Sequence, residues 1–100
     1  MLLGAGLVVS IPDEHFVIAE SSVSEVTSLL RAQGLPTADL VEERVEILAA
    51  RDHFDGIIGC VGIERHGPFA LLRSLAVARG HRRRGIGGEL VEAALQRAER

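Results

Sequence analysis

The spacing of apolar residues changes along the chain, and each change predicts a different kind of element. Residues 15–20 are mostly apolar and predict a strand, whereas the apolar positions within 23–30 recur at helical spacing. Ser22 and Glu25 stand at the positions of a capping box, which predicts the start of this helix. The Gly-Leu-Pro sequence at 34–36 predicts its end.

The middle of the chain predicts a short helix followed by three strands. Thr37 is a suitable cap for a second helix that reaches Glu43. Asp and Gly residues at 52–56 and the His-Gly-Pro sequence at 66–68 predict two short turns. The apolar and β-branched segments around these turns predict the strands Val45–Arg51, Ile57–Arg65 and Phe69–Val77. Strands joined by turns this short pair antiparallel.

The last segment returns to helical spacing. Its apolar face consists of Ile86, Leu90, Ala94 and Ala98, and the opposite face consists of Glu89, Glu92, Gln96 and Glu99. The complete order β-α-α-β-β-β-α predicts an α/β fold with helices flanking a mixed, mainly antiparallel sheet. We expect one domain over residues 1–100, in which residues 1–14 remain an unassigned N-terminal segment.

Composition narrows the classes of function. The 100 residues are 47% hydrophobic and 25% charged, which is typical of a soluble globular domain. The apolar stretch 2–11 is shorter than the roughly 20 residues that span a bilayer, so we expect no membrane partner. The single cysteine, Cys60, fits a core position in a reducing compartment, and the cytoplasm is the expected location. The four histidines and Cys60 lack the spacing of metal ligands, so we expect no metal.

Positive charge is concentrated where the last helix begins. Residues 1–78 contain five Arg against eleven Asp and Glu, whereas residues 79–100 contain six Arg against three Glu. Arg82, Arg83 and Arg84 crowd a helix N-terminus, where the helix dipole already disfavours cations. A bound anion would relieve this repulsion, because free amides and guanidinium groups both bind phosphate oxygens.

The glycines that follow narrow the kind of phosphate site. Gly85, Gly87 and Gly88 would let the backbone approach a ligand closely. A P-loop requires a lysine, and the chain contains none. The dinucleotide fingerprint would require glycine at the position of Leu90. The order Arg82-x-x-Gly85-x-Gly87 instead matches the acyl-CoA pattern of Arg or Gln, two residues, Gly, one residue, and Gly or Ala.

Leu75-Ala76-Val77, a short loop and Arg82–Gly88 together resemble motif A of the GNAT superfamily of N-acyltransferases, and the resemblance covers roughly residues 15–100. Within the superfamily, residues 34–40 and 70–77 are similar to a group of N-acetyltransferases associated with arsenic-resistance operons. The resemblance implies that acetyl-CoA is the donor and that a primary amine of a small molecule is the acceptor. In this family the amine attacks the thioester directly within a ternary complex.

The resemblance also implies roles for individual residues at the cofactor site. Backbone groups of Leu75, Ala76 and Val77 would contact the pantetheine arm. The pyrophosphate would be held by the segment Arg82, Arg83, Arg84, Gly85, Ile86, Gly87 and Gly88.

The residues on the acceptor side each have two possible roles. Glu64, at the end of a predicted strand, is the best candidate for a general base, with an ordinary surface carboxylate as the alternative. Arg73 would form a structural ion pair with Glu46 or Glu64, or would recognise an anionic substrate. Ser74 would contact the substrate or serve as a hydroxyl within the sheet. His66 is read as a turn residue rather than a base.

The family's fold continues beyond the last helix with a strand, a helix and two further strands that the 100 residues do not include. Three explanations stay open: a fragment, a naturally truncated protein, and completion by a second copy. A sheet that ends at Phe69–Val77 would expose an apolar edge, which proteins normally cover. We therefore expect association, for instance as a homodimer.

Two other functions also stay open. A binding module that holds acyl-CoA or another phosphorylated ligand without catalysing transfer would use the same loop. Nucleic-acid binding through Arg79–Arg84 is the weaker alternative, because the rest of the chain is acidic and lacks aromatic side chains for base stacking. We therefore expect no nucleic-acid partner.

Overall fold

The computed structural model describes residues 15–40 and 44–99. Its elements are β1 (Phe16–Ser21), α1 (Val23–Ala32), β2 (Val45–Asp52), β3 (Ile57–His66), β4 (Phe69–Val77), a 3₁₀ turn (Arg79–His81) and α2 (Ile86–Ala98). The four strands form one sheet in the order β1-β2-β3-β4, and every neighbouring pair is antiparallel. The predicted α/β class and the antiparallel run of strands are therefore confirmed.

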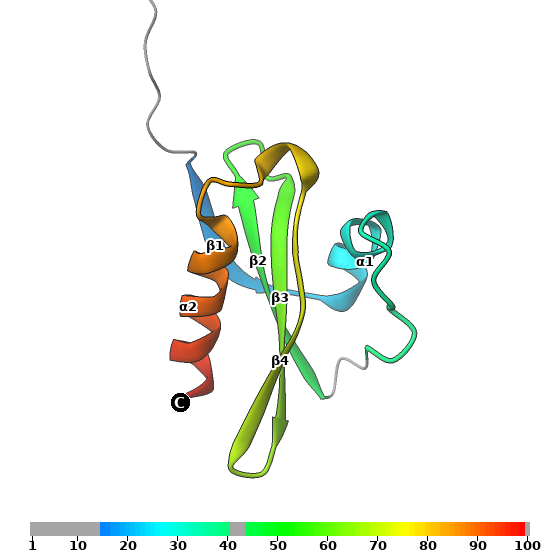
Figure 1. Ribbon diagram of the computed structural model, residues 1–100, viewed down its shortest axis with the longest axis vertical. Coiled ribbons are helices and arrows are strands. Elements are labelled where there is room, and N and C mark those ends of the chain that lie inside the picture. The colour runs from blue at the N-terminus through cyan, green and yellow to red at the C-terminus, as the bar shows by residue number, and fades with distance from the viewer. Residues whose placement is uncertain (1–14, 41–43, 100) are drawn as a thin grey trace, which may run out of the picture.

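The two helices cover opposite faces of the sheet (Figure 1). On one face, Val26 and Leu30 of α1 pack into a buried cluster that includes Ile47. On the other face, Leu90 of α2 packs into a second cluster that includes Leu48. Successive side chains of a strand point to opposite faces, so the apolar runs of β2 and β3 supply both cores.

The start of α2 lies close against the sheet because Gly59 of β3 has no side chain. A Cβ atom at Gly59 would stand 3.0 Å from Leu90 Cδ1, 3.2 Å from Ile86 Cγ2 and 3.2 Å from the carbonyl oxygen of Ala76. The first turn of α2 is thereby held next to the end of β4. This contact determines where the N-terminus of the helix points.

The far end of α2 is held by two arginines. Arg65 of β3 donates hydrogen bonds to the carbonyl oxygens of Arg97 and Ala98, in the last turn of α2, at 2.9 and 3.1 Å. The Arg97 guanidinium pairs with Glu20 of β1 at 2.5 Å and with Glu46 of β2 at 2.6 Å. The helix is therefore fixed to the sheet at both ends.

β4 carries a bulge halfway along its length. Cys60 lies opposite Ala76 and Gly62 opposite Arg73, so β4 advances three residues where β3 advances two. Ser74 sits in the bulge with a φ of 56°, and its carbonyl oxygen accepts a hydrogen bond from Cys60 Sγ at 3.5 Å. Burial raises the pKa of the Cys60 thiol to about 11, so this residue packs as a neutral core side chain, as the sequence predicted.

The chain after α1 differs from the prediction. The capping box of Ser22 and Glu25 is confirmed. Residues 37–40, however, form a turn in which the Leu40 amide donates to the carbonyl oxygen of Thr37 at 3.1 Å. Long-range contacts override the local helix signal here, because Leu40 is buried in the core and Asp39 pairs with an arginine of β4. The rest of the predicted second helix, 41–43, lies outside the described residues.

Neither α1 nor α2, the helices of the described part of the chain, is long and apolar enough to cross a membrane. The apolar stretch 2–11 lies outside the described residues.

Gly59→Ala should lower the free energy of unfolding by about 1–3 kcal/mol, because the added methyl group would overpack the contact between α2 and the sheet. Urea denaturation would measure this loss. Gly80→Ala is the matched control, since a Cβ there would meet no heavy atom within 4 Å. Equal stability of the two variants would contradict the close approach of α2 to β3.

Candidate functional site

The loop that joins β4 to α2 turns the chain sharply into the helix. Arg83 has a φ of 66°, and Gly85, the N-cap of α2, has a φ of 80°. Glycine adopts this left-handed conformation without steric cost, which explains its presence at the cap. Together these residues aim the N-terminus of α2 at the end of β4.

The first amides of α2 are available to a ligand. The Glu89 amide donates to the carbonyl oxygen of Gly85 at 3.0 Å, which is the first helical hydrogen bond. The amides of Ile86, Gly87 and Gly88 precede it and have no acceptor within the helix. Gly85 has no side chain to cap them, and a Cβ at Gly88 would meet nothing within 4 Å. The surface over these amides is therefore open to an anion, which the helix dipole attracts.

The three arginines of the loop are all exposed but differ in their contacts. Arg82 Nε donates to the carbonyl oxygen of Val77 at 3.2 Å, and the guanidinium also donates to Gln33 Oε1. Arg82 thus extends toward β4 and the C-terminal end of α1. Arg83 and Arg84 add positive charge next to the helix start.

β4 runs from this loop to the far end of the sheet along a free edge. No strand among the described residues pairs with its outer side. Backbone N–H and C=O groups on such an edge are available to a ligand. Next to the loop this edge is formed by Leu75, which is 46% exposed, buried Ala76 and half-buried Val77.

A cluster of charged side chains lies on the α1 face of the sheet. Arg73 donates to Glu64 Oε1 at 2.8 Å and to Asp39 Oδ2 at 2.6 Å. His66 Nε2 lies 3.0 Å from the other carboxylate oxygen of Glu64. The hydrogen bond from Arg73 holds the pKa of Glu64 below its ordinary value of 4.5 and the pKa of Asp39 below 3.8. Both carboxylates are therefore charged at neutral pH.

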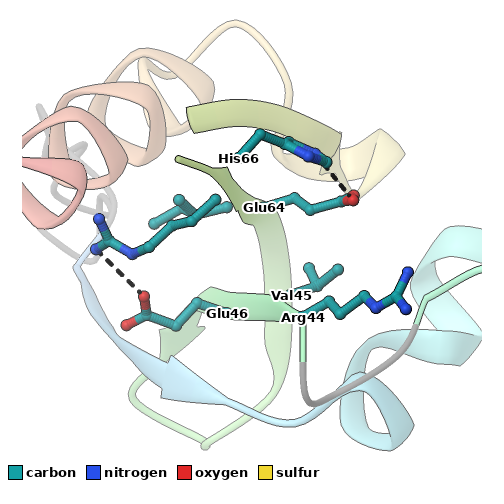
Figure 2. Close-up of a pocket in the computed structure, with 7 residues that line it drawn as sticks. Arg44, Val45, Glu46, Glu64 and His66 are labelled. Atoms are coloured by element: carbon teal, nitrogen blue, oxygen red, sulfur yellow. Dashed lines mark ion pairs between the residues drawn. The ribbon is translucent and has the colours of Figure 1, made fainter. Parts of the chain in front are cut away.

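An open pocket of about 490 Å³ adjoins this cluster (Figure 2). It is lined by the start of β2 and the end of β3, namely Arg44, Val45, Glu46, Ile63, Glu64, Arg65 and His66. The ion pair of His66 and Glu64 lies on one side of the pocket and Glu46 on the other (Figure 2). The lining carries both signs of charge, because Glu46 and Glu64 lie beside Arg44 and Arg65.

The structure brings three of the acceptor-side residues, Glu64, His66 and Arg73, into contact. Arg73 pairs with Glu64, one of the two partners left open, whereas Glu46 pairs with Arg97 across the other face. Ser74 is the bulge residue of β4. The proposed roles of the individual site residues stay predictions.

The contacts of Gln33 and Asp39 at the site were not predicted from the sequence. These two residues contact Arg82 and Arg73, which lie 49 and 34 residues further along the chain. No periodicity or motif connects residues this far apart. The only local signal was the Gly-Leu-Pro sequence at 34–36, which predicts the end of α1 but not the path of the chain beyond it.

Comparison with solved structures places the fold among N-acyltransferases. A protein from Klebsiella pneumoniae described as an acyl-CoA N-acyltransferase superimposes with a TM-score of 0.73 at 22% identity, over 84% of this chain and 63% of that one. The ribosomal-protein-alanine N-acetyltransferase of Brucella melitensis gives 0.69 at 21% identity, over 85% and 72%. An aminoglycoside 6'-N-acetyltransferase complexed with coenzyme A gives 0.68 at 24% identity, over 83% and 55%. The chain thus spans less than two thirds of the first of these proteins.

A comparison with family profiles shows that the similarity includes the amino-acid sequence as well as the fold. No curated protein matches the chain significantly. The profile of the acetyltransferase (GNAT) domain, however, matches residues 43–100, which include β2, β3, β4, the loop and α2. Because this match covers more than half of the sequence, the chain belongs to the GNAT acetyltransferase family.

Proposed function

We propose that the chain transfers an acetyl group from acetyl-CoA to a primary amine of a small molecule. The observation that carries this proposal is the open N-terminus of α2, which directly follows the free edge of β4. The amides of Ile86, Gly87 and Gly88 would bind the pyrophosphate, assisted by the charge of Arg83 and Arg84. Membership of the GNAT family supports acetyl transfer as the general reaction.

The pantetheine arm would lie along the outer edge of β4. Its amide groups can exchange hydrogen bonds with the outward-facing backbone groups of the segment Leu75–Val77, much as an added strand would. The Val77 carbonyl oxygen would then be shared with Arg82 Nε. An arm extended along β4 from the loop leads toward the bulge at Ser74 and then toward Arg73. The cofactor would therefore present its acetyl end on the side of the cluster of Asp39, Glu64, His66 and Arg73.

Acetyl transfer requires the amine nitrogen to lose two protons. The ammonium first loses one proton to the proposed acceptor, Glu64 with its neighbour His66. The neutral amine then attacks the carbonyl carbon of the thioester, a C–N bond forms and the C–S bond breaks. The nitrogen loses its second proton to the departing sulfur, so that CoA leaves as the thiol. Support for the proposed acceptor comes from the 3.0 Å separation of Glu64 and His66 beside the open pocket.

The contacts of Arg73 disfavour an anionic acceptor. Its guanidinium already binds two carboxylates, those of Glu64 and Asp39. The guanidinium is therefore already occupied, and the two carboxylates would repel an added anion. Recognition of an anionic substrate by Arg73 is accordingly the less favoured alternative.

A non-catalytic acyl-CoA-binding module is the second candidate function. The contacts of Glu64 favour it, because Arg73 and His66 each approach a different oxygen of this carboxylate and leave it less available for proton transfer. The two functions differ in their product, since only transfer releases free CoA in the presence of an amine.

Association as a homodimer and the similarity to acetyltransferases of arsenic-resistance operons also remain proposals. Association as a homodimer has a physical basis in β4, where Phe69, Leu71 and Leu75 are 75%, 51% and 46% exposed. A second copy could cover the Phe69–Leu71 end of this strand, which leaves the edge at Leu75–Val77 to the cofactor. The similarity to acetyltransferases of arsenic-resistance operons rests on residues 34–40 and 70–77.

Gly88→Leu should weaken the binding of acetyl-CoA about tenfold or more, because the side chain would separate the phosphate oxygens from the helix amides. Leucine has a higher helix propensity than glycine, so the free energy of unfolding should not fall. Calorimetric titration with acetyl-CoA would measure the affinity. Glu92→Leu places the same side chain one turn further along α2 and is the control. Similar affinities of the two variants would exclude this helix end as the phosphate site.

Glu64→Gln should lower the rate of amine-dependent CoA release about 100-fold while leaving acetyl-CoA affinity nearly unchanged. A thiol assay with a panel of small primary amines would measure the rate. Because the pKa of Glu64 lies below 4.5, its carboxylate should stay charged, and its contribution should be lost only as pH falls below that value. Acetyl-CoA binding without CoA release for any amine would favour the binding module instead.

A further inference from the structure

Arg82, the first residue of the acyl-CoA motif, is directed away from the helix amides that the motif serves. Its Nε donates to the carbonyl oxygen of Val77 at 3.2 Å, and its guanidinium donates to Gln33 Oε1. The first contact ties the loop to the last residue of β4, and the second ties it to the end of α1. The two contacts occupy Nε and one N–H of Nη2 among the five guanidinium donors, and they fix the direction in which the side chain extends.

Gln33 is itself held in a defined position. It is the C-cap residue of α1, and its amide donates to the carbonyl oxygens of Leu29 and Leu30 at 3.2 and 3.1 Å. Leu30 is fully buried, and the amide of Leu35 returns to its carbonyl oxygen at 2.9 Å. The Gln33 side chain therefore extends from a fixed backbone and can serve as an anchor.

The segment 33–40 is held on the β4 side at two points. Arg82 binds its first residue, and Arg73 of β4 binds Asp39 near its end at 2.6 Å. Between these points the segment packs Leu35 against the core cluster of the α1 face, and Leu40 belongs to that cluster. The two arginines thus act as braces between the segment 33–40 and the β4 side of the sheet.

We propose that Arg82 is a positioning residue. It fixes the loop relative to β4 and α1 through Val77 and Gln33, and it does not contact the phosphates. Positive charge for the ligand then comes from the neighbouring Arg83 and Arg84. The pyrophosphate amides and the backbone of Leu75–Val77 keep their relative positions only while this brace is intact. The expected effect of this brace on acetyl-CoA binding rests on the proposed function, whereas the brace itself does not.

The experiment uses Gln33→Ala, a neutral substitution on α1, outside the loop and β4. Combined with Arg82→Ala and the double variant, it forms a double-mutant cycle. Hydrogen exchange of the His81 and Glu89 amides, whose hydrogen bonds close the loop, is measured without cofactor. Acetyl-CoA affinity is measured by calorimetry. Gln96→Ala, which truncates an exposed glutamine on α2, is the matched control.

Gln33→Ala should speed exchange of both amides and weaken acetyl-CoA binding, each about fivefold, as expected for loss of one hydrogen bond. The double variant should be no worse than Arg82→Ala alone, because both substitutions break the same brace. Gln96→Ala should behave like the unmodified protein.

Gln33→Ala with unchanged exchange and unchanged affinity, beside a large loss of affinity in Arg82→Ala, would make Arg82 a phosphate ligand and overturn the proposal. Additive losses of affinity in the double variant would also overturn the proposal, because they would show that Gln33 and Arg82 act independently. If exchange responds as expected but the unmodified protein binds no acetyl-CoA, the brace stands and the proposed cofactor fails.

Discussion

The pairing of β4 along one edge only is the constraint on which the candidate site depends. Its inner edge is registered against β3, and its outer edge has no strand partner among the described residues. The bulge at Ser74 lets β4 shift register without losing its place in the sheet. A strand exposed in this way, ending at the N-terminus of a helix, offers backbone groups and a helix dipole to one extended anionic ligand.

Several arginines of the described residues have distinct structural roles. Arg65 and Arg97 hold α2 to the sheet, while Arg73 and Arg82 hold the segment after α1. A guanidinium suits such tasks because its planar fork makes several hydrogen bonds at once. The concentration of Arg near the last helix therefore has a structural role in addition to the binding role that we propose. Charge counting along the sequence cannot separate the two.

The sequence predicted what depends on local physical chemistry. The capping box at Ser22 and the short turns at 52–56 and 66–68 follow from rules that act over a few residues, and they are present. The bulge at Ser74 was not predicted, since it appears only when β4 is registered against β3. The brace between Gln33 and Arg82 was missed for a similar reason, because it joins elements distant in sequence. Residues 37–40, where a second helix was predicted, form a turn instead, because Asp39 pairs with Arg73 of β4.

The most direct test of the account is an NMR titration of the ¹⁵N-labelled chain with acetyl-CoA, with ATP as the comparison ligand. Saturable shifts are expected, largest for the amides of residues 75–77 and 85–88, and ATP, which has no pantetheine arm for β4, should bind more weakly. Shifts confined to other parts of a well-folded chain, or equal binding of both ligands, would contradict the placement of the cofactor along β4 and the start of α2.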